Sequence, residues 1–130
     1  MIEEYIKKIR EILFKFKNID YAFIFGSFIK RPLPKSDIDI LLGATLKPFE
    51  KIDLAMELEL FLQRKVDIVL VKEAPCELVL KAFSEGLPVL INDKQILKRD
   101  YYRNSYLYEN RSTLRALRIS RIKKKYSHAG

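Results

Sequence analysis

The chain of 130 residues has few of the residues that usually cross-link or interrupt a protein. It contains a single cysteine, Cys76, which excludes an internal disulfide and a cysteine metal cluster and agrees with a reducing compartment. Only 4 glycines and 5 prolines are present beside 48% apolar residues, a composition typical of a compact domain and unlike that of a disordered chain. At this length one domain can bury roughly two-thirds of the surface that its unfolded chain exposes.

A long apolar run is also missing. The N-terminal segment 1–16 interrupts its apolar residues with charges every two or three positions, which argues against a signal peptide and against a membrane span. We therefore expect a cytoplasmic protein with no membrane partner.

Most of the chain lacks an excess of either charge. Residues 1–97 carry 15 Lys/Arg and 15 Asp/Glu, whereas residues 98–130 carry 10 against 2, which is the whole net charge of +8. This pattern predicts a core at 1–97 and a basic, tyrosine-rich, helical segment at 98–130 that belongs to the same domain. Basic and aromatic residues together could bind RNA or DNA, but a long helix that packs on the domain or on a partner is the simpler interpretation.

Apolar spacing predicts alternating helices and strands. Apolar residues at three- and four-residue steps are typical of helices, and short β-branched or aromatic runs are typical of strands. We expect helices at 2–17, 27–31, 48–63 and 76–84, another from Lys94 onward capped by Asp93, and strands at 21–25, 36–42, 66–71 and 88–91. The order predicts an α/β (α+β) fold with helices packed on one small mixed β-sheet.

The predicted helix 48–63 carries an apolar stripe. Such a stripe is typical of a helix that packs on a core. Its members are Phe49, Ile52, Ala55, Met56 and Leu60, and Leu58 and Leu62 widen it.

Two aspartates are prominent in the predicted strand 36–42. Asp37 and Asp39 are separated by one residue, so both project from one face, roughly 6–7 Å apart at their bases. Carboxylates this close repel one another and resist burial unless they are solvated or hold a cation. Oxygen ligands without a nearby His or Cys favour Mg²⁺ or Mn²⁺ over zinc. Asp67 could complete a triad if its strand is a neighbour. The alternative for Asp37 and Asp39 is a solvated strand edge, and the alternative for Asp67 is a surface aspartate at the start of a strand.

Gly26 and Ser27 follow the first predicted strand. A residue without a side chain lets backbone N–H groups and the Ser27 hydroxyl approach a phosphate oxygen at such a strand-to-helix turn. Lys30, Arg31 and Lys35 could add positive charge for a polyphosphate, although a solvated loop is the simpler explanation for these three. A two-metal site here would hold a triphosphate, lower the pKa of an attacking hydroxyl and stabilise the departing pyrophosphate.

The complete set of motifs resembles a known superfamily. Gly26-Ser27, nine residues, then Asp37-Ile38-Asp39 in an apolar strand, and Asp67 in VDIVLV resemble the polymerase-β-type nucleotidyltransferases, specifically their minimal nucleotidyltransferase (MNT) branch, over about residues 5–92. The resemblance implies that Gly26 and Ser27 bind the nucleotide's phosphates, that Asp37 and Asp39 hold both metal ions, and that Asp67 joins one metal and helps to activate the nucleophile. Residues 28–32 depart from the pattern, because many relatives have an Arg, a small residue, another Arg and a Gly there.

The resemblance also implies a biological role. Many MNT proteins are antitoxins encoded beside HEPN-type ribonuclease toxins, and the active ones transfer AMP from ATP to a tyrosine of the toxin. For this chain it implies a protein adenylyltransferase that uses two Mg²⁺ ions, or Mn²⁺, with ATP and a HEPN-type toxin as partners. The alternative is an antitoxin that neutralises its toxin by direct masking, without catalysis.

Overall fold

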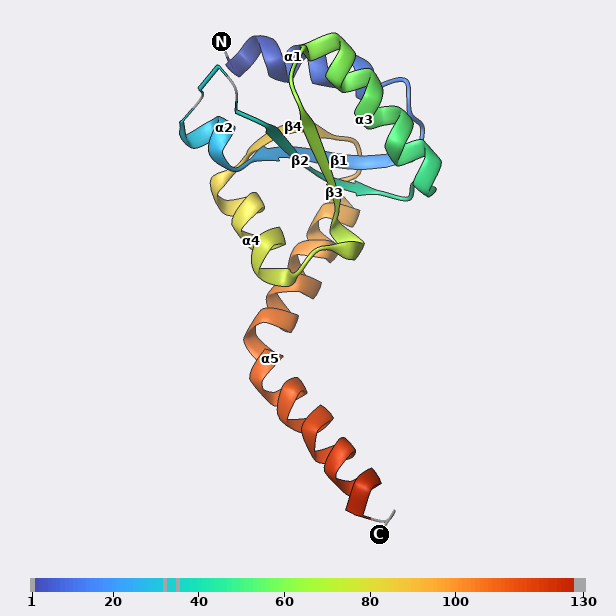
Figure 1. The fold of residues 1–130 in the computed structure, drawn as a ribbon, viewed down its shortest axis with the longest axis vertical. Helices are drawn as coiled ribbons and strands as arrows, with labels where there is room; N and C mark the ends of the chain where they lie inside the picture. The colour runs from blue at the N-terminus through green and yellow to red at the C-terminus, as the bar shows by residue number, and fades with distance from the viewer. Residues whose placement is uncertain (1, 32, 35, 128–130) are drawn as a thin grey trace.

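A mixed four-stranded sheet lies between two layers of helices (Figure 1). The computed structural model describes residues 2–31, 33–34 and 36–127, and in the last helix it describes side chains as far as Arg111 and at 115 and 119–121. The elements follow the predicted order: α1 (Ile2–Leu13), β1 (Ile19–Phe25), α2 (Ser27–Lys30), β2 (Ile38–Ala44), α3 (Pro48–Leu62), β3 (Val66–Leu70), a 3₁₀ turn η1 (Val71–Glu73), α4 (Cys76–Glu85), β4 (Leu87–Ile91) and α5 (Lys94–Ser127).

The strand order β3-β2-β1-β4 makes β3 an edge strand. β1 pairs antiparallel with β2 and β4, and β2 pairs parallel with β3. The predicted mixed sheet is therefore confirmed, and the strand that carries Asp67 is a neighbour of the strand that carries Asp39.

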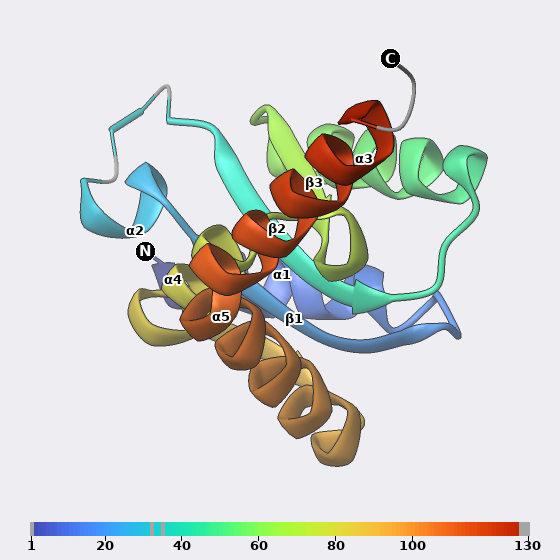
Figure 2. The same ribbon diagram turned by 90° about the horizontal axis from the view of Figure 1, so that it is seen from below.

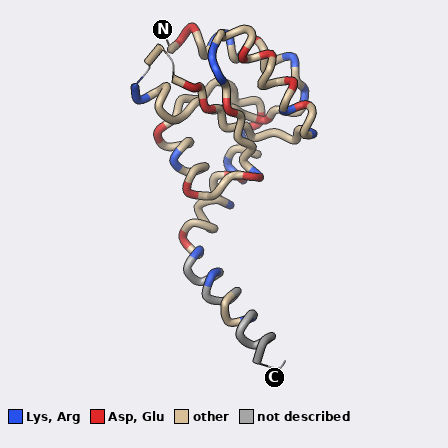
Figure 3. The backbone as a smooth tube through the Cα atoms, in the orientation of Figure 1, with Lys and Arg blue, Asp and Glu red and all other residues tan. Residues whose placement is uncertain are grey.

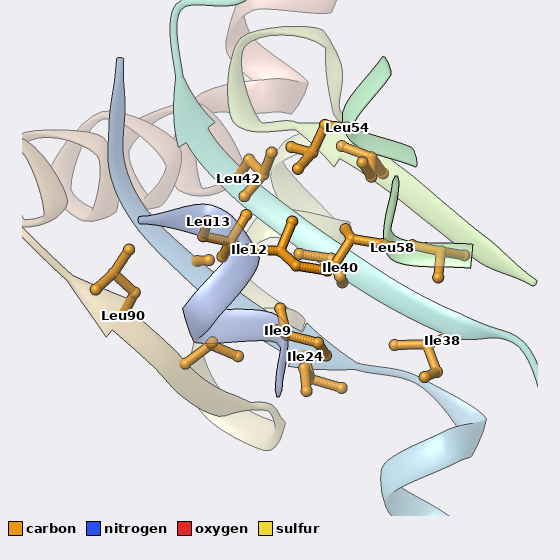
Figure 4. Packing of buried hydrophobic residues seen from close by; sticks show 14 of the residues in the cluster. Ile9, Ile12, Leu13, Ile24, Ile38, Ile40, Leu42, Leu54, Leu58 and Leu90 are labelled. Carbon is orange, nitrogen blue, oxygen red and sulfur yellow. The ribbon is translucent and has the colours of Figure 1, made fainter. Parts of the chain in front are cut away.

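Alternation along the strands divides the core between the two faces of the sheet. Ile38, Ile40 and Leu42 point to the face that α1 and α3 cover, where Ile9 and Leu58 meet them (Figure 4). Tyr21, Phe23 and Leu41 point to the other face. The helices α4 and α5 lie on that side of the sheet (Figure 2). Asp39 shares the face of Leu41, so the carboxylates lie on the side of α4.

The predicted apolar stripe of α3 faces the core only in part, through Ala55, Leu58 and Leu62. The buried residues of α3 are Leu54, Leu58 and Leu62. Phe49, Ile52, Met56 and Leu60 are between 56% and 72% exposed. Because α3 is apolar on two sides, periodicity alone could not show which side packs on the sheet. The side that does so carries the three buried leucines, which recur at every fourth residue.

The first helix is shorter than predicted. α1 ends at Leu13, whereas the apolar pattern continued to residue 17. The amides of Lys15 and Phe16 bond to the carbonyls of Ile12 and Leu13, three residues earlier, which tightens the chain into a turn.

α5 begins where predicted and then leaves the domain. The Asp93 carboxylate accepts hydrogen bonds from the amides of Gln95 (3.0 Å) and Ile96 (3.1 Å), so Asp93 caps the helix. Asp100 and Asn104 are buried against the domain, and the rest of α5 projects away from it (Figure 1). Lys and Arg recur along that projecting part, whereas most Asp and Glu lie in the domain (Figure 3). The division at residue 97 falls inside α5 and stays a prediction. Within the described residues, none of the helices is long and apolar enough to cross a membrane.

Candidate active site

At Gly26 the Gly-Ser turn comes into contact with the strand that carries Asp39. It lies between β1 and α2 with φ +86°, a conformation that favours glycine. A Cβ at this position would lie 2.5 Å from Oδ2 of Asp39, so a side chain here would displace the carboxylate from the turn. The sequence separates the two residues, but the antiparallel pairing of Phe25 with Asp39 joins them.

The three predicted aspartates lie on neighbouring strands. Asp39 pairs directly with Asp67 in the parallel register, about 5 Å away as neighbouring strands require, and Asp37 precedes β2. Asp37 and Asp67 are exposed, and Asp39 is half-buried. Burial, followed by the charges of Asp67 and Asp37, raises the pKa of the Asp39 carboxyl. The structure therefore places Asp37 and Asp67 close enough to Asp39 for their charges to act on it.

This donor set fits a hard divalent cation. Only carboxylate oxygens are offered, and none of the three forms an ion pair within the described side chains. A cation would offset the repulsion that raises the pKa of Asp39. As the side chains lie, no three Asp, Glu, His or Cys groups in the described part of the chain are arranged to hold an ion, so the carboxylates would turn toward one another to do so.

A pocket opens beside the Gly-Ser turn. It has a volume of about 590 Å³, and its walls come from the end of β1, from α2 and from α4. The four residues predicted to bind the nucleotide all line it, namely Gly26, Ser27, Lys30 and Arg31. Its opposite wall is formed by Glu77, Leu78, Lys81 and Glu85. Sequence reasoning missed this wall, since nothing in the sequence indicates that α4 faces a motif some fifty residues earlier.

The basic residues of the pocket have different surroundings. Lys30 forms an ion pair with Glu85 (3.1 Å), and both side chains are about half exposed. Arg31 is exposed at the pocket. Lys35 lies outside the described residues. The pairing shows that part of the positive charge near the Gly-Ser turn is already neutralised by α4.

Arg64 holds the segment that leads to Asp37, and sequence reasoning missed it too. One of its terminal nitrogens donates to the carbonyls of Leu33 and Ser36, both at 3.0 Å. Nε donates to the Tyr5 hydroxyl (3.0 Å), and the guanidinium lies over the rings of Tyr5 and Phe28. Leu33 and Ser36 follow the stretch 28–32 that departs from the family pattern, so a side chain from a distant loop supports the segment that leads to Asp37.

One family model and several solved structures are similar to this chain. The family described as Polymerase beta, Nucleotidyltransferase matches residues 7–95. Similar chains occur in a toxin–antitoxin crystal structure with AMP-PNP (23% identity, TM-score 0.73, covering 91% of this chain and 98% of that chain) and in the MntA-HepT toxin–antitoxin (22%, 0.71, 93% and 98%). Another occurs in the tri-AMPylated Shewanella oneidensis HEPN toxin in complex with MNT antitoxin (22%, 0.72, 95% and 99%).

At these identities the structural likeness shows the fold, which is the predicted one. No curated protein matches the chain. The family match covers more than half of the chain and includes the Gly-Ser turn and all three aspartates. The chain therefore belongs to the polymerase-β nucleotidyltransferase family.

Proposed function

We propose that this chain is a Mg²⁺-dependent nucleotidyltransferase that moves AMP from ATP to a tyrosine hydroxyl of a HEPN-type toxin, and that it thereby acts as an antitoxin. The observation that carries the proposal is the close approach of Gly26 to Asp39, which places the Gly-Ser turn directly beside the strand that carries the carboxylates. Two similar structures support the choice of substrates: one is a toxin–antitoxin with AMP-PNP, and another contains an AMPylated HEPN toxin.

The nucleotide would occupy the pocket between α2 and α4. The Gly-Ser turn lines this pocket, and the Ser27 hydroxyl and Arg31 are available as donors. Lys30 would exchange Glu85 for a phosphate oxygen. The remaining length of the pocket, along Leu78 and Lys81, offers space for the nucleoside.

The carboxylates would perform the chemistry at the neighbouring strands. Asp37, Asp39 and Asp67 would hold two Mg²⁺ or Mn²⁺ ions, which when bound neutralise phosphate charge and lower the pKa of a hydroxyl. The acceptor oxygen forms a bond to the α-phosphorus while the bond to the bridging oxygen breaks, and pyrophosphate leaves with the electron pair. Asp67, exposed at the edge strand, takes the acceptor proton.

The test is transfer of α-labelled AMP to the HEPN-type protein encoded in the neighbouring open reading frame. Asp37→Asn combined with Asp39→Asn should abolish labelling, while Glu3→Gln with Glu4→Gln, two exposed carboxylates of α1, should label like the wild type. Parallel reactions with each labelled nucleoside triphosphate identify the donor. Unchanged labelling by the Asn variant, or the absence of a HEPN-type neighbour, would contradict the proposal.

Masking without catalysis is the second candidate, and the projecting part of α5 favours it as a binding element. Under this alternative the double Asn variant still protects cells from the toxin, and a chain ending at Asn110, which lacks the projecting part of α5, does not. Under the catalytic proposal the double Asn variant loses protection. Cytoplasmic location stays a prediction in both cases.

A further inference from the structure

α3 exposes an apolar stripe to solvent, away from the nucleotide pocket. Phe49, Ile52, Met56 and Leu60 recur at three- and four-residue steps along the outer side of the helix, and each is more than half exposed. Single exposed apolar residues are ordinary, but a continuous row of four on one helix is typical of a protein-binding surface.

The stripe borders a groove that reaches the candidate active site. The groove has a volume of about 450 Å³ and runs between the first half of α3 and the edge strand β3. Ile52 belongs to both the stripe and the groove, and Asp67 lines the groove on the side of β3. The apolar surface is therefore continuous with one of the three candidate carboxylates.

The order of the strands places the nucleotide phosphates and the acceptor hydroxyl on opposite sides of the candidate carboxylates. The Gly-Ser turn follows β1, Asp39 lies on β2 and Asp67 lies on β3, which is the edge. The phosphates, and hence the departing pyrophosphate, belong at the Gly-Ser turn. Because the attacking and leaving oxygens lie roughly in line across the α-phosphorus, the acceptor hydroxyl must arrive from the side of Asp67. α2 and α3 lie on opposite sides of β3 in both views (Figures 1 and 2).

The charges of α3 indicate which class of macromolecule can bind the stripe and the groove. The helix carries the carboxylates Glu50, Asp53, Glu57 and Glu59 against the single Lys51. An acidic helix beside acidic site residues repels a nucleic acid backbone. An apolar protein surface with basic residues at its rim complements the stripe and its carboxylates.

We infer that the α3 stripe and the groove along β3 form the docking surface of the acceptor protein, and that this protein presents its hydroxyl to Asp67 from the sheet edge. The inference rests on the proposed function, because it assigns the acceptor side of the same site. The nucleotide pocket between α2 and α4 stays open while the acceptor is docked.

The test replaces exposed apolar groups with charge. Ile52→Glu combined with Met56→Glu should weaken binding of the HEPN-type neighbour at least tenfold and raise the KM for that protein in AMP transfer, with little change in kcat at saturation or in ATP binding. Phe14→Glu, a change at a similarly exposed aromatic residue outside the stripe, is the control and should behave like the wild type. Ile52→Gln combined with Met56→Gln tests the same surface without added charge and should weaken binding by a smaller factor.

The outcomes separate the two proposals. Binding is measured directly between the purified proteins and does not depend on AMP transfer. If the wild-type chain binds the neighbour but transfers no AMP, the proposed function is contradicted. The binding of the stripe variants then still tests the docking surface. Stripe variants that bind the neighbour as tightly as the wild type would overturn the inference. It would also be overturned if the substitutions convert a dimer of this chain to a monomer, since the surface would then serve a second copy.

Discussion

At the residue scale, Gly26 determines how closely the Gly-Ser turn and the Asp39 carboxylate can pack. Its φ of +86° is one reason for glycine, and the 2.5 Å that would separate a Cβ from Asp39 Oδ2 is a second, independent one. Any side chain there must either move Asp39 or change the turn. Both movements displace groups that the proposed transfer requires to be held in fixed positions.

Gly26→Ala should reduce AMP transfer by about 100-fold, because a displacement of roughly 1 Å in a catalytic group has an effect of that size. The free energy of unfolding should fall by about 1–3 kcal/mol from the positive φ. Asn18→Ala, a small change on the exposed loop before β1, serves as the control. Steady-state transfer and urea unfolding measure the two effects, and wild-type activity in the Ala variant would show that the contact is not required.

A second residue-scale feature anchors α5. The Tyr21 hydroxyl donates to Oδ2 of Asp100 (2.7 Å), and both residues are buried. Burial and this hydrogen bond to Asp100 raise the pKa of Tyr21 above its ordinary value. Arg99 also donates to the other oxygen of Asp100, so the carboxylate keeps a partner if Tyr21 is changed.

Tyr21→Phe should lower the free energy of unfolding by about 2 kcal/mol at neutral pH, because it removes a hydrogen bond to a buried charged group. The raised pKa of Tyr21 also makes the free energy of unfolding depend on pH. Above about pH 10 the unfolded chain releases the tyrosine proton while the folded chain keeps it, so wild-type stability falls as the pH rises. The Phe variant should lack this part of the fall.

Chemical unfolding from neutral pH to about pH 11 measures both effects. Tyr102→Phe, at a tyrosine that is 69% exposed, should leave stability and its pH dependence unchanged. An identical alkaline fall in wild type and Tyr21→Phe would show that Tyr21 does not cause it.

At the scale of elements, the connection from α2 to β2 depends on Arg64. Its guanidinium contacts two carbonyls of that connection and two aromatic rings, from Tyr5 and Phe28. Ser36 strengthens the turn by accepting a hydrogen bond from the Leu33 amide (3.1 Å). These contacts support the position of Asp37, the residue after Ser36. Arg64 makes its contacts with backbone carbonyls and aromatic rings and not with a carboxylate.

Arg64→Lys should keep the positive charge but lose the planar guanidinium. A lysine ammonium cannot both stack on the two rings and donate to the two carbonyls in the same way. The free energy of unfolding should fall by about 1–2 kcal/mol. The concentration of Mg²⁺ needed for half-maximal AMP transfer should rise, because Asp37 is less well positioned. Lys65→Ala, at the exposed neighbouring residue, is the control. A loss of stability with an unchanged Mg²⁺ requirement would limit Arg64 to a structural role.

At the scale of the whole molecule, α5 connects the domain to a projecting arm. Its first part packs on α4 and β1, where Asp100 and Asn104 are buried. Farther along, Arg111 forms an ion pair with Glu77 of α4 (2.7 Å), but both side chains are about half exposed. Such an exposed pair contributes little to stability. The stability of the domain should therefore depend on the first part of the helix and not on the arm.

A chain ending at Asn110 should unfold within a few degrees of the full-length thermal midpoint and keep AMP transfer. A chain ending at Leu97 loses the buried Asp100 and should unfold at a much lower temperature. Calorimetry of both chains tests the division at residue 97 directly. Equal midpoints for the two shortened chains would show that residues 98–110 are not part of the domain. Salt-sensitive RNA or DNA binding that disappears with the arm would support the nucleic-acid interpretation of the basic residues.

Local patterns were sufficient for much of this protein. The element order, the alternation of Asp39 with Ile38 and Ile40, and the Asp93 cap follow from side-chain periodicity and backbone chemistry, which act over a few residues. The motif set of Gly26, Ser27, Asp37, Asp39 and Asp67 also predicted the family, because the chemistry of phosphates and divalent cations restricts residue type and spacing.

Only the tertiary structure decided which groups meet. Pairing of β1 with β2 places Gly26 against Asp39, packing places α4 opposite the Gly-Ser turn, and Arg64 reaches the connection before Asp37 from another loop. The same holds for α3, where burial of Leu54, Leu58 and Leu62 leaves the other apolar side in solvent. These outcomes depend on contacts between residues far apart in the chain, and no local pattern contains them.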